Sequence, residues 1–136
     1  MDERGRLVVQ AGVPPDYFSE TGQLWGNPQY HWQRMQGTDF EWWLQRFDSA
    51  ARQFDIVRID HFRALQAYWE IPAGATSARE GRWVEAPGRE LLRAVRRRYP
   101  ELKLVAENLG LITADVEALR AEFALPGMVV LQFAFD

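Results

Sequence analysis

The chain has 136 residues, a length that suits about one small domain. Its hydrophobic share of 47%, charged share of 26% and net charge of −3 are typical of a soluble globular protein and favour neither a nucleic-acid nor a membrane partner. It has no cysteine for a disulfide framework, no apolar run near the roughly 20 residues of a membrane helix and no signal-peptide pattern at Met1–Arg4, so the expected compartment is the cytoplasm.

The first 37 residues read mostly as a long loop. Residues 7–10 suit a short strand, whereas residues 11–36 contain three prolines and three glycines and show no helical or strand periodicity. Long loops in compact domains are often lids or binding loops. The mixture of polar and aromatic side chains suits the hydroxyl groups and flat faces of sugars, although a surface connection that packs its own aromatic rings has the same composition.

From residue 38 onward, predicted helices alternate with short apolar strands. A capping box at Thr38–Glu41 predicts the start of a helix whose apolar face runs to Phe54. The chain then predicts strands at 56–59, 102–106 and 128–133, helices at 88–99 and from 113, and a loop at 72–88, with 64–71 ambiguous. This order predicts an α/β fold with parallel strands. The basic stretch Arg93–Arg98 lies on the second helix, where a solvated face is favoured over a nucleic-acid patch.

Two acidic residues end two of the predicted strands. Asp60 follows the strand at 56–59, and Glu107 follows the strand at 102–106. The carboxyl ends of parallel strands meet at one edge, and paired strands lie about 4.8 Å apart. The two carboxyl groups are therefore expected roughly 5–5.5 Å apart, the separation that a retaining glycosidase mechanism requires.

The neighbours of the two acids predict different roles. Arg58 shares a strand face with Asp60, and a nearby cation favours the ionised carboxylate that a nucleophile needs. Glu107 follows apolar residues and has no cation beside it in the sequence, so we expect it to hold a proton as general acid and then act as base. Spacing alone leaves one alternative open, a structural Arg58–Asp60 ion pair with Glu107 as a solvated strand end.

The two histidines do not predict a metal site, because His31 and His61 are far apart in the sequence. No phosphate-binding or other cofactor motif is present, so neither a metal nor an organic cofactor is expected. His61 follows Asp60 directly and is expected to donate a hydrogen bond to substrate or to a neighbouring loop.

Five groups of residues together carry a family resemblance. They are AGVPPDYFSETGQLWGNPQY (11–30), RIDHFRAL (58–65), IPAG with GRWVEAPG (71–74 and 81–88), VAENLG (105–110) and LQFAFD (131–136). These stretches resemble the 4-α-glucanotransferases, also called amylomaltases or disproportionating enzymes, which are relatives of the α-amylases. The resemblance spans nearly the whole chain, whereas the Arg-x-Asp pattern alone would indicate only the wider amylase-like group.

The resemblance implies a fold and a set of site residues. The fold is an interrupted (β/α)8 TIM barrel, in which residues 1–37 cover the substrate and residues 38–136 form β/α units that carry the catalytic acids. The nucleophile is Asp60 and the acid/base is Glu107. The implied substrate-binding residues are Arg58, which orients the nucleophile, His61, the stacking residue Trp25, and Asp16 and Asn27.

The implied activity is transfer of an α-1,4-glucan segment to the 4-hydroxyl of glucose or a maltooligosaccharide. The implied partners are maltooligosaccharides and glucans derived from starch or glycogen. The family has a third catalytic Asp in a Thr-His-Asp run after LQFAFD, and this run is not in the sequence, so we expect a fragment that is inactive or nearly so by itself. An α-amylase-like hydrolase and a non-catalytic glucan-binding piece are the alternatives.

Overall fold

The computed structural model describes residues 4–17 and 19–133. Its strands and helices are β1 (Val9–Val13), β2 (Gln23–Pro28), α1 (Trp32–Gly37), α2 (Glu41–Ala51), β3 (Ile56–Ile59), β4 (Ala67–Pro72), β5 (Arg82–Glu85), α3 (Gly88–Arg98), β6 (Lys103–Ala106) and α4 (Ala114–Glu122). Three short 3-10 helices are η1 (Phe62–Leu65), η2 (Ala78–Glu80) and η3 (Leu131–Phe133). None of the helices in this part of the chain combines the length and apolarity needed to cross a bilayer.

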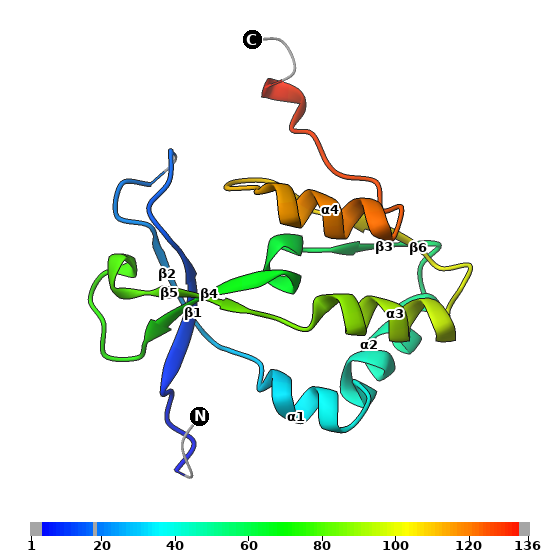
Figure 1. Cartoon of the computed structure of the whole chain (residues 1–136), viewed down its shortest axis with the longest axis horizontal. Helices are drawn as coiled ribbons and strands as arrows, with labels where there is room; N and C mark the ends of the chain where they lie inside the picture. Colours follow the sequence, from blue (N-terminus) through cyan, green and yellow to red (C-terminus); the bar gives the residue numbers. More distant parts are fainter. Residues whose placement is uncertain (1–3, 18, 134–136) are drawn as a thin grey trace.

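Four strands form an antiparallel sheet in the order β2-β1-β4-β5. Figure 1 shows this sheet on one side of the molecule, with the parallel strands and the four α-helices on the other. Strand β1 is central, since Gly12 pairs with Leu24 of β2 and with Trp69 of β4. A Cβ atom at Gly12 would lie 2.1 Å from the carbonyl oxygen of Gln23, so glycine permits the close approach of β2.

Strands β3 and β6 form a separate parallel pair, as the sequence predicted. Their register runs from Ile56 opposite Lys103 to Ile59 opposite Ala106. The connection between them includes η1, β4, β5 and α3, so the antiparallel sheet is partly an insertion into a β/α crossover. The fold is therefore α/β, with one parallel pair and an additional antiparallel sheet.

The hydrophobic core is built mainly from η1, α3, β6 and α4. Its fully buried side chains include Phe62 of η1, Val116 of α4, and Leu91, Leu92 and Val95 of α3. Leu91, Leu92 and Val95 lie at helical spacing along α3, so this amphipathic helix buries one face in the core shared with η1 and β6. The segment that follows Asp60 is therefore anchored in the core through Phe62 and Leu65.

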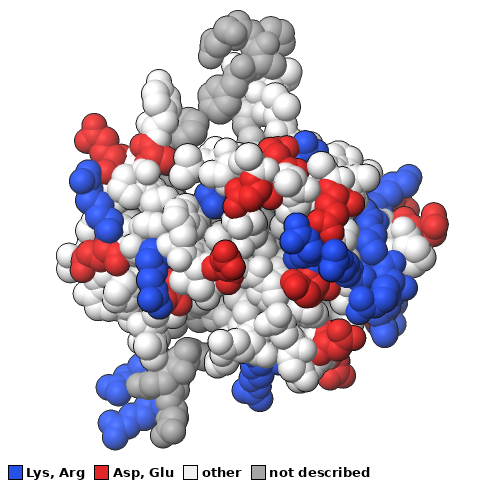
Figure 2. Space-filling model, in the orientation of Figure 1, with Lys and Arg blue, Asp and Glu red and all other residues white. Residues whose placement is uncertain are grey.

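The basic face of α3 is paired with carboxylates of the same chain. Arg89 and Arg93 both contact Glu122 of α4, at 2.7 and 3.1 Å, and Arg97 lies 3.7 Å from Asp39. Figure 2 shows blue and red side chains interleaved over this side of the molecule. These pairs explain the basic stretch as a surface that links α3 to neighbouring elements.

Residues 11–36 are not the long loop that the sequence predicted. They form much of β1, all of β2 and most of α1. Every residue of β2 is exposed, so the strand lacks the apolar–polar alternation that marks a half-buried strand. The predicted loop at 72–88 likewise contains β5, a short and mostly exposed strand paired with β4.

The prediction of a capping box at Thr38–Glu41 was also wrong. Thr38 ends α1, and its hydroxyl donates to the carbonyl oxygen of Met35 at 3.2 Å. Helix α2 instead begins after Phe40, which has a left-handed backbone with φ 58° and donates its N–H to the same Met35 carbonyl. The short link between α1 and α2 uses these backbone bonds in place of a side-chain cap.

The third predicted parallel strand, at 128–133, is not present. Residues 131–133 form η3, and Val129 and Leu131 are 80% and 69% exposed. The backbone approaches β6 only earlier, where Ala106 donates to the carbonyl oxygen of Pro126 at 2.8 Å. An apolar run forms a β-strand only where a neighbouring strand pairs with its backbone N–H and C=O groups. The last three residues of the LQFAFD stretch lie outside the described residues.

Candidate active site

The parallel register brings Asp60 and Glu107 to the same end of β3 and β6. Each acid follows a residue of the last register pair, Ile59 opposite Ala106. The ladder continues one step further, because the N–H of Glu107 donates to the carbonyl oxygen of Ile59 at 2.9 Å. The N–H of Phe62 then donates to the carbonyl oxygen of Glu107, also at 2.9 Å. The backbones that carry the two acids are therefore bonded together at the carboxyl edge of the strands.

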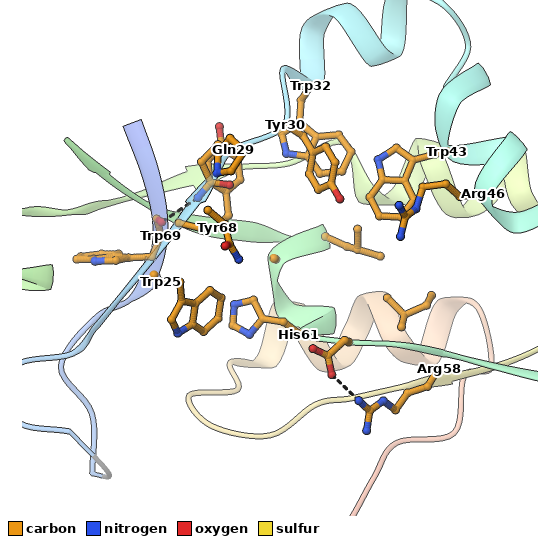
Figure 3. Close-up of a pocket in the computed structure, with 18 of the residues that line it drawn as sticks. Trp25, Gln29, Tyr30, Trp32, Trp43, Arg46, Arg58, His61, Tyr68 and Trp69 are labelled. Atoms are coloured by element: carbon orange, nitrogen blue, oxygen red, sulfur yellow. Dashed lines mark hydrogen bonds and ion pairs between the residues drawn. The ribbon is translucent and has the colours of Figure 1, made fainter. Parts of the chain in front are cut away.

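Arg58 and Asp60 lie on one face of β3, as strand alternation predicts. The Nη2 of Arg58 donates to Oδ1 of Asp60 at 2.8 Å, and Figure 3 shows this contact at the edge of the pocket. The two side chains are 55% and 74% exposed. The contact orients the carboxylate of Asp60 through Oδ1, one of its two oxygens.

The carboxylate of Glu107 is turned towards the backbone beside Asp60. Its Oε2 accepts the N–H of His61 at 2.7 Å, and its Oε1 accepts the N–H of Leu109 at 2.9 Å. The immediate partners of Glu107 are therefore polar, where the sequence suggested an apolar wall. This arrangement fixes the direction of the side chain from both the segment after β3 and its own loop.

His61 has a left-handed backbone, with φ 48° and ψ 53°, which turns the chain sharply after Asp60. Its ring lies edge to face with the ring of Trp25, and the two ring centroids are 4.9 Å apart. Burial lowers the pKa of His61, and this effect outweighs the carboxylates of Glu107 and Asp60, which raise it. The imidazole is therefore held neutral over a wider pH range than a free histidine.

A pocket of about 490 Å³ opens beside Asp60. Five of the residues predicted from the sequence line it, namely Trp25, Asn27, Arg58, Asp60 and His61. The structure adds further lining residues that the sequence did not single out, chiefly Gln29, Tyr30, Trp43, Tyr68 and Trp69 (Figure 3). Aromatic faces and amide groups around a carboxylate suit a ligand that has both flat apolar faces and hydroxyl groups.

Glu107 is a predicted residue that does not line this pocket, and Asp16 is another. Asp16 lies in the connection between β1 and β2, where its Oδ1 accepts the N–H of Ser19 at 2.8 Å. The N–H of Asp16 in turn donates to the carbonyl oxygen of Ser19 at 3.0 Å. These bonds shape a turn, which gives Asp16 a structural part here.

Sequence reasoning also missed Arg63 and Asn108. Arg63 is 5% exposed although it carries a charge, and only its place two residues after His61 could have drawn attention to it. Asn108 follows Glu107, donates to Glu117 of α4 at 2.9 Å and accepts the N–H of Met128 at 2.8 Å. Both residues connect the strand ends to the surrounding structure. Among the described residues, no three His, Cys, Asp or Glu side chains gather as a metal site would require.

Comparison with known proteins assigns the chain to a family. The sequence profile of the 4-alpha-glucanotransferases matches residues 2–136. The chain belongs to the 4-alpha-glucanotransferase family. It is 57% identical over 136 residues to a 4-alpha-glucanotransferase of Thermus thermophilus, and 53% identical over 135 residues to one of Synechocystis sp.. These alignments cover 100% and 98% of this chain and 27% of each relative.

Solved structures of the family share this fold. An amylomaltase from Streptococcus agalactiae in complex with acarbose matches with a TM-score of 0.94 at 41% identity, over 99% of this chain and 27% of that one. The chain thus spans about a quarter of the length of the glucanotransferases it matches, as the 27% coverage states. The match confirms the α/β fold and the family resemblance.

Proposed function

We propose that the protein containing this segment is a 4-α-glucanotransferase that works by a retaining double displacement. The observation that carries the proposal is the junction of β3 and β6, where Glu107 accepts the N–H of His61 directly beside Asp60. Two carboxylates at adjoining strand ends suit a reaction at one anomeric carbon when they are roughly 5–5.5 Å apart. Membership of the glucanotransferase family supports the same reaction.

The first half of the reaction forms a covalent intermediate. The carboxylate of Asp60 attacks the anomeric carbon of an α-1,4-glucan as the bond to the leaving oxygen breaks, and Glu107 gives its proton to that oxygen. Arg58 orients the attacking carboxylate through its 2.8 Å contact. The shortened glucan then leaves with its new 4-hydroxyl group.

The second half transfers the enzyme-bound glucan to an acceptor. Glu107, now ionised, takes the proton from the 4-hydroxyl of glucose or a maltooligosaccharide as this oxygen attacks the anomeric carbon. The bond to Asp60 breaks and both acids return to their starting states. A sugar acceptor competes with water best in a covered site, and we assign this cover to residues 1–37, which include β2 and Trp25.

The substrates proposed are maltooligosaccharides and glucans derived from starch or glycogen. The names of the relatives support this class, as does the aromatic lining of the pocket. Trp25, Asn27 and His61 are proposed as sugar contacts and Asp16 as a weaker one. We further propose that residues 38–136 are β/α units of an interrupted TIM barrel, with β3 and β6 as neighbouring barrel strands, and that the protein acts in the cytoplasm.

One experiment separates this function from the two alternatives. The complete enzyme is compared with Asp60→Asn and, as a matched control, Asp55→Asn in the exposed segment before β3. A glucanotransferase converts maltotriose into longer and shorter oligosaccharides with little gain of reducing ends, and Asp60→Asn removes this turnover while Asp55→Asn keeps it. A steady gain of reducing ends indicates a hydrolase, and glucan binding without any turnover in the wild type indicates a binding module.

A further inference from the structure

We propose that Arg63 is a positioning residue that holds the loop of Glu107 in register with Asp60. This inference rests on the proposed glucan transfer, since it concerns the protonation step that Glu107 performs there. Arg63 lies in η1, three residues after Asp60, and is 5% exposed.

The guanidinium of Arg63 joins three separate segments. Its Nη1 donates to the carbonyl oxygen of Leu111 at 2.8 Å, in the loop between Glu107 and α4. Its Cζ lies 3.7 Å from the centroid of the Trp83 ring, on β5 of the antiparallel sheet. One side chain therefore ties the segment after the nucleophile to the acid/base loop and to the antiparallel sheet.

The loop of Glu107 is consequently held at both ends by residues 61–63. At its start, the N–H groups of His61 and Phe62 donate to the side chain and the backbone of Glu107. Further along the loop, Arg63 donates a hydrogen bond to the carbonyl oxygen of Leu111. A loop fixed at two points from the same short helix keeps a constant position relative to Asp60.

Stability alone does not account for a charge at this place. Burial is the main cause that lowers the pKa of Arg63, with the charge of Asp115 acting against it. The Nε of Arg63 is buried and has no hydrogen-bond partner among the residues that the structure describes. An apolar side chain of similar length would fill the space without the desolvation of a cation. The planar guanidinium is suited to a different task, because it can stack on a ring and donate a hydrogen bond in its plane at the same time.

The test measures the first turnover of the complete enzyme with two glucosyl donors. Maltotriose has a leaving glucose that must be protonated, whereas the fluoride of α-maltosyl fluoride leaves without a proton. The variants are Arg63→Met, which keeps the apolar stem, Arg63→Lys, which keeps the charge, and Glu107→Gln as a reference. Arg82→Met is the matched control, because Arg82 sits beside Trp83 but is exposed and pairs with Glu70.

A positioning role predicts a loss that depends on the donor. We expect Arg63→Met to slow the first turnover of maltotriose by about 100-fold, the effect of a small misplacement of a catalytic group, and that of the fluoride by less than about 10-fold. Arg63→Lys should fall between Arg63→Met and the wild type. Arg82→Met should stay within about twofold on both donors.

Equal slowing on both donors, or no slowing, overturns the proposal, since a purely structural role lowers the folded fraction for both reactions alike. If Arg63→Met does not fold, Arg63→Lys decides by the same comparison, and unchanged rates on both donors overturn it. The proposed function fails separately if Glu107→Gln shows no selective loss on maltotriose, because Glu107 is then not the acid.

Discussion

His61 lies between the two proposed catalytic acids through its backbone, and its ring contacts Trp25, a proposed sugar-stacking residue. Its N–H binds Glu107, and its ring packs against Trp25 at 4.9 Å. The ring is kept neutral mainly by burial. A neutral imidazole can donate a hydrogen bond to a sugar hydroxyl or accept one from it. It carries no positive charge that would pair with the carboxylate of Asp60.

The lowered pKa of His61 predicts a loss of stability in mild acid. Unfolding returns the ring to water and to its ordinary pKa of 6.5, so the unfolded chain takes up a proton first as the pH falls. Stability should therefore decrease from about pH 6.5 down to the folded-state pKa and then level off. The measurement is the Tm of the wild type and of His61→Gln between pH 8 and pH 5. The wild type should lose more of its Tm than the variant, and parallel losses would contradict the assignment.

Trp25 should contribute to substrate affinity more than to the chemical step. A sugar face stacked on its ring is worth about 0.5–1.5 kcal/mol, so Trp25→Ala should raise KM for maltotriose roughly 2- to 10-fold with a smaller change in kcat. Trp42→Ala is the control, because Trp42 is equally exposed, at 42% against 39%, and does not line the pocket. Equal changes in KM for both variants would remove Trp25 from the site.

At the residue scale, the sequence identified what depends on local spacing. The Arg58–Asp60 contact follows from strand alternation, and the position of Asp60 and Glu107 at the same end of β3 and β6 follows from two short apolar runs that each precede an acid. Arg63 was missed because its partner Trp83 is 20 positions away on an edge strand, and no local pattern connects the two. The turn bonds of Asp16 were not predicted either, because a turn-forming Asp and a ligand-binding Asp have similar neighbours in the sequence.

The contact between α3 and η1 illustrates how the elements hold the site. Gly88 begins α3, and a Cβ atom there would lie 2.0 Å from the carbonyl oxygen of Leu65. Helix α3 therefore packs closer to η1 than any other residue at position 88 would allow. This close contact keeps η1 packed on the core, together with His61 and Arg63.

Gly88→Ala should destabilise the protein through this contact. Forcing α3 away from η1 costs about 1–3 kcal/mol of unfolding free energy, as other overpacked cores do. Gly37→Ala is the matched control, because a Cβ atom there meets nothing within 4 Å, and it should be neutral or stabilising by up to about 1 kcal/mol. Chemical denaturation measures both changes. A neutral Gly88→Ala would show that the close approach is not needed.

At the element scale, the strands that the sequence missed share one property. Strand β2 is exposed at every position and β5 at three of four, so neither has an apolar face to produce a period of two. Their pairing comes from β1 and β4, which lie elsewhere in the chain. The boundary between α1 and α2 was also missed, because Asp39 and Phe40 have a left-handed backbone, which non-glycine residues rarely adopt.

The described residues leave the proposed nucleophile open to solvent, with the side chain of Asp60 74% exposed, so the segment up to residue 37 does not complete the cover by itself. A transferase has to favour a sugar over water, which requires a covered site. We therefore expect purified residues 1–136 to show no disproportionation of maltotriose above a no-enzyme control, while the complete enzyme is active. Measurable disproportionation by residues 1–136 alone would contradict this expectation.

At this scale the sequence correctly indicated an α/β fold with neighbouring parallel strands, because β3 and β6 are short apolar runs that each end in an acid. It could not reveal the antiparallel sheet, of which β4 and β5 lie between β3 and β6 in the sequence. Strands β2 and β5 are short and mostly exposed, and the glycines and prolines in and around them resemble loop punctuation.

The central claim is that Asp60 and Glu107 act on one anomeric carbon, with Asp60 as the nucleophile. The most direct test treats Glu107→Gln of the complete enzyme with α-maltosyl fluoride, which needs no acid for the first step but leaves the intermediate without a base for the second. Peptide mass spectrometry then locates the bound sugar. We expect one maltosyl group on the peptide that contains Asp60, and its absence from Asp60→Asn, Glu107→Gln. A sugar on any other residue, or no adduct while fluoride is released, would contradict the claim.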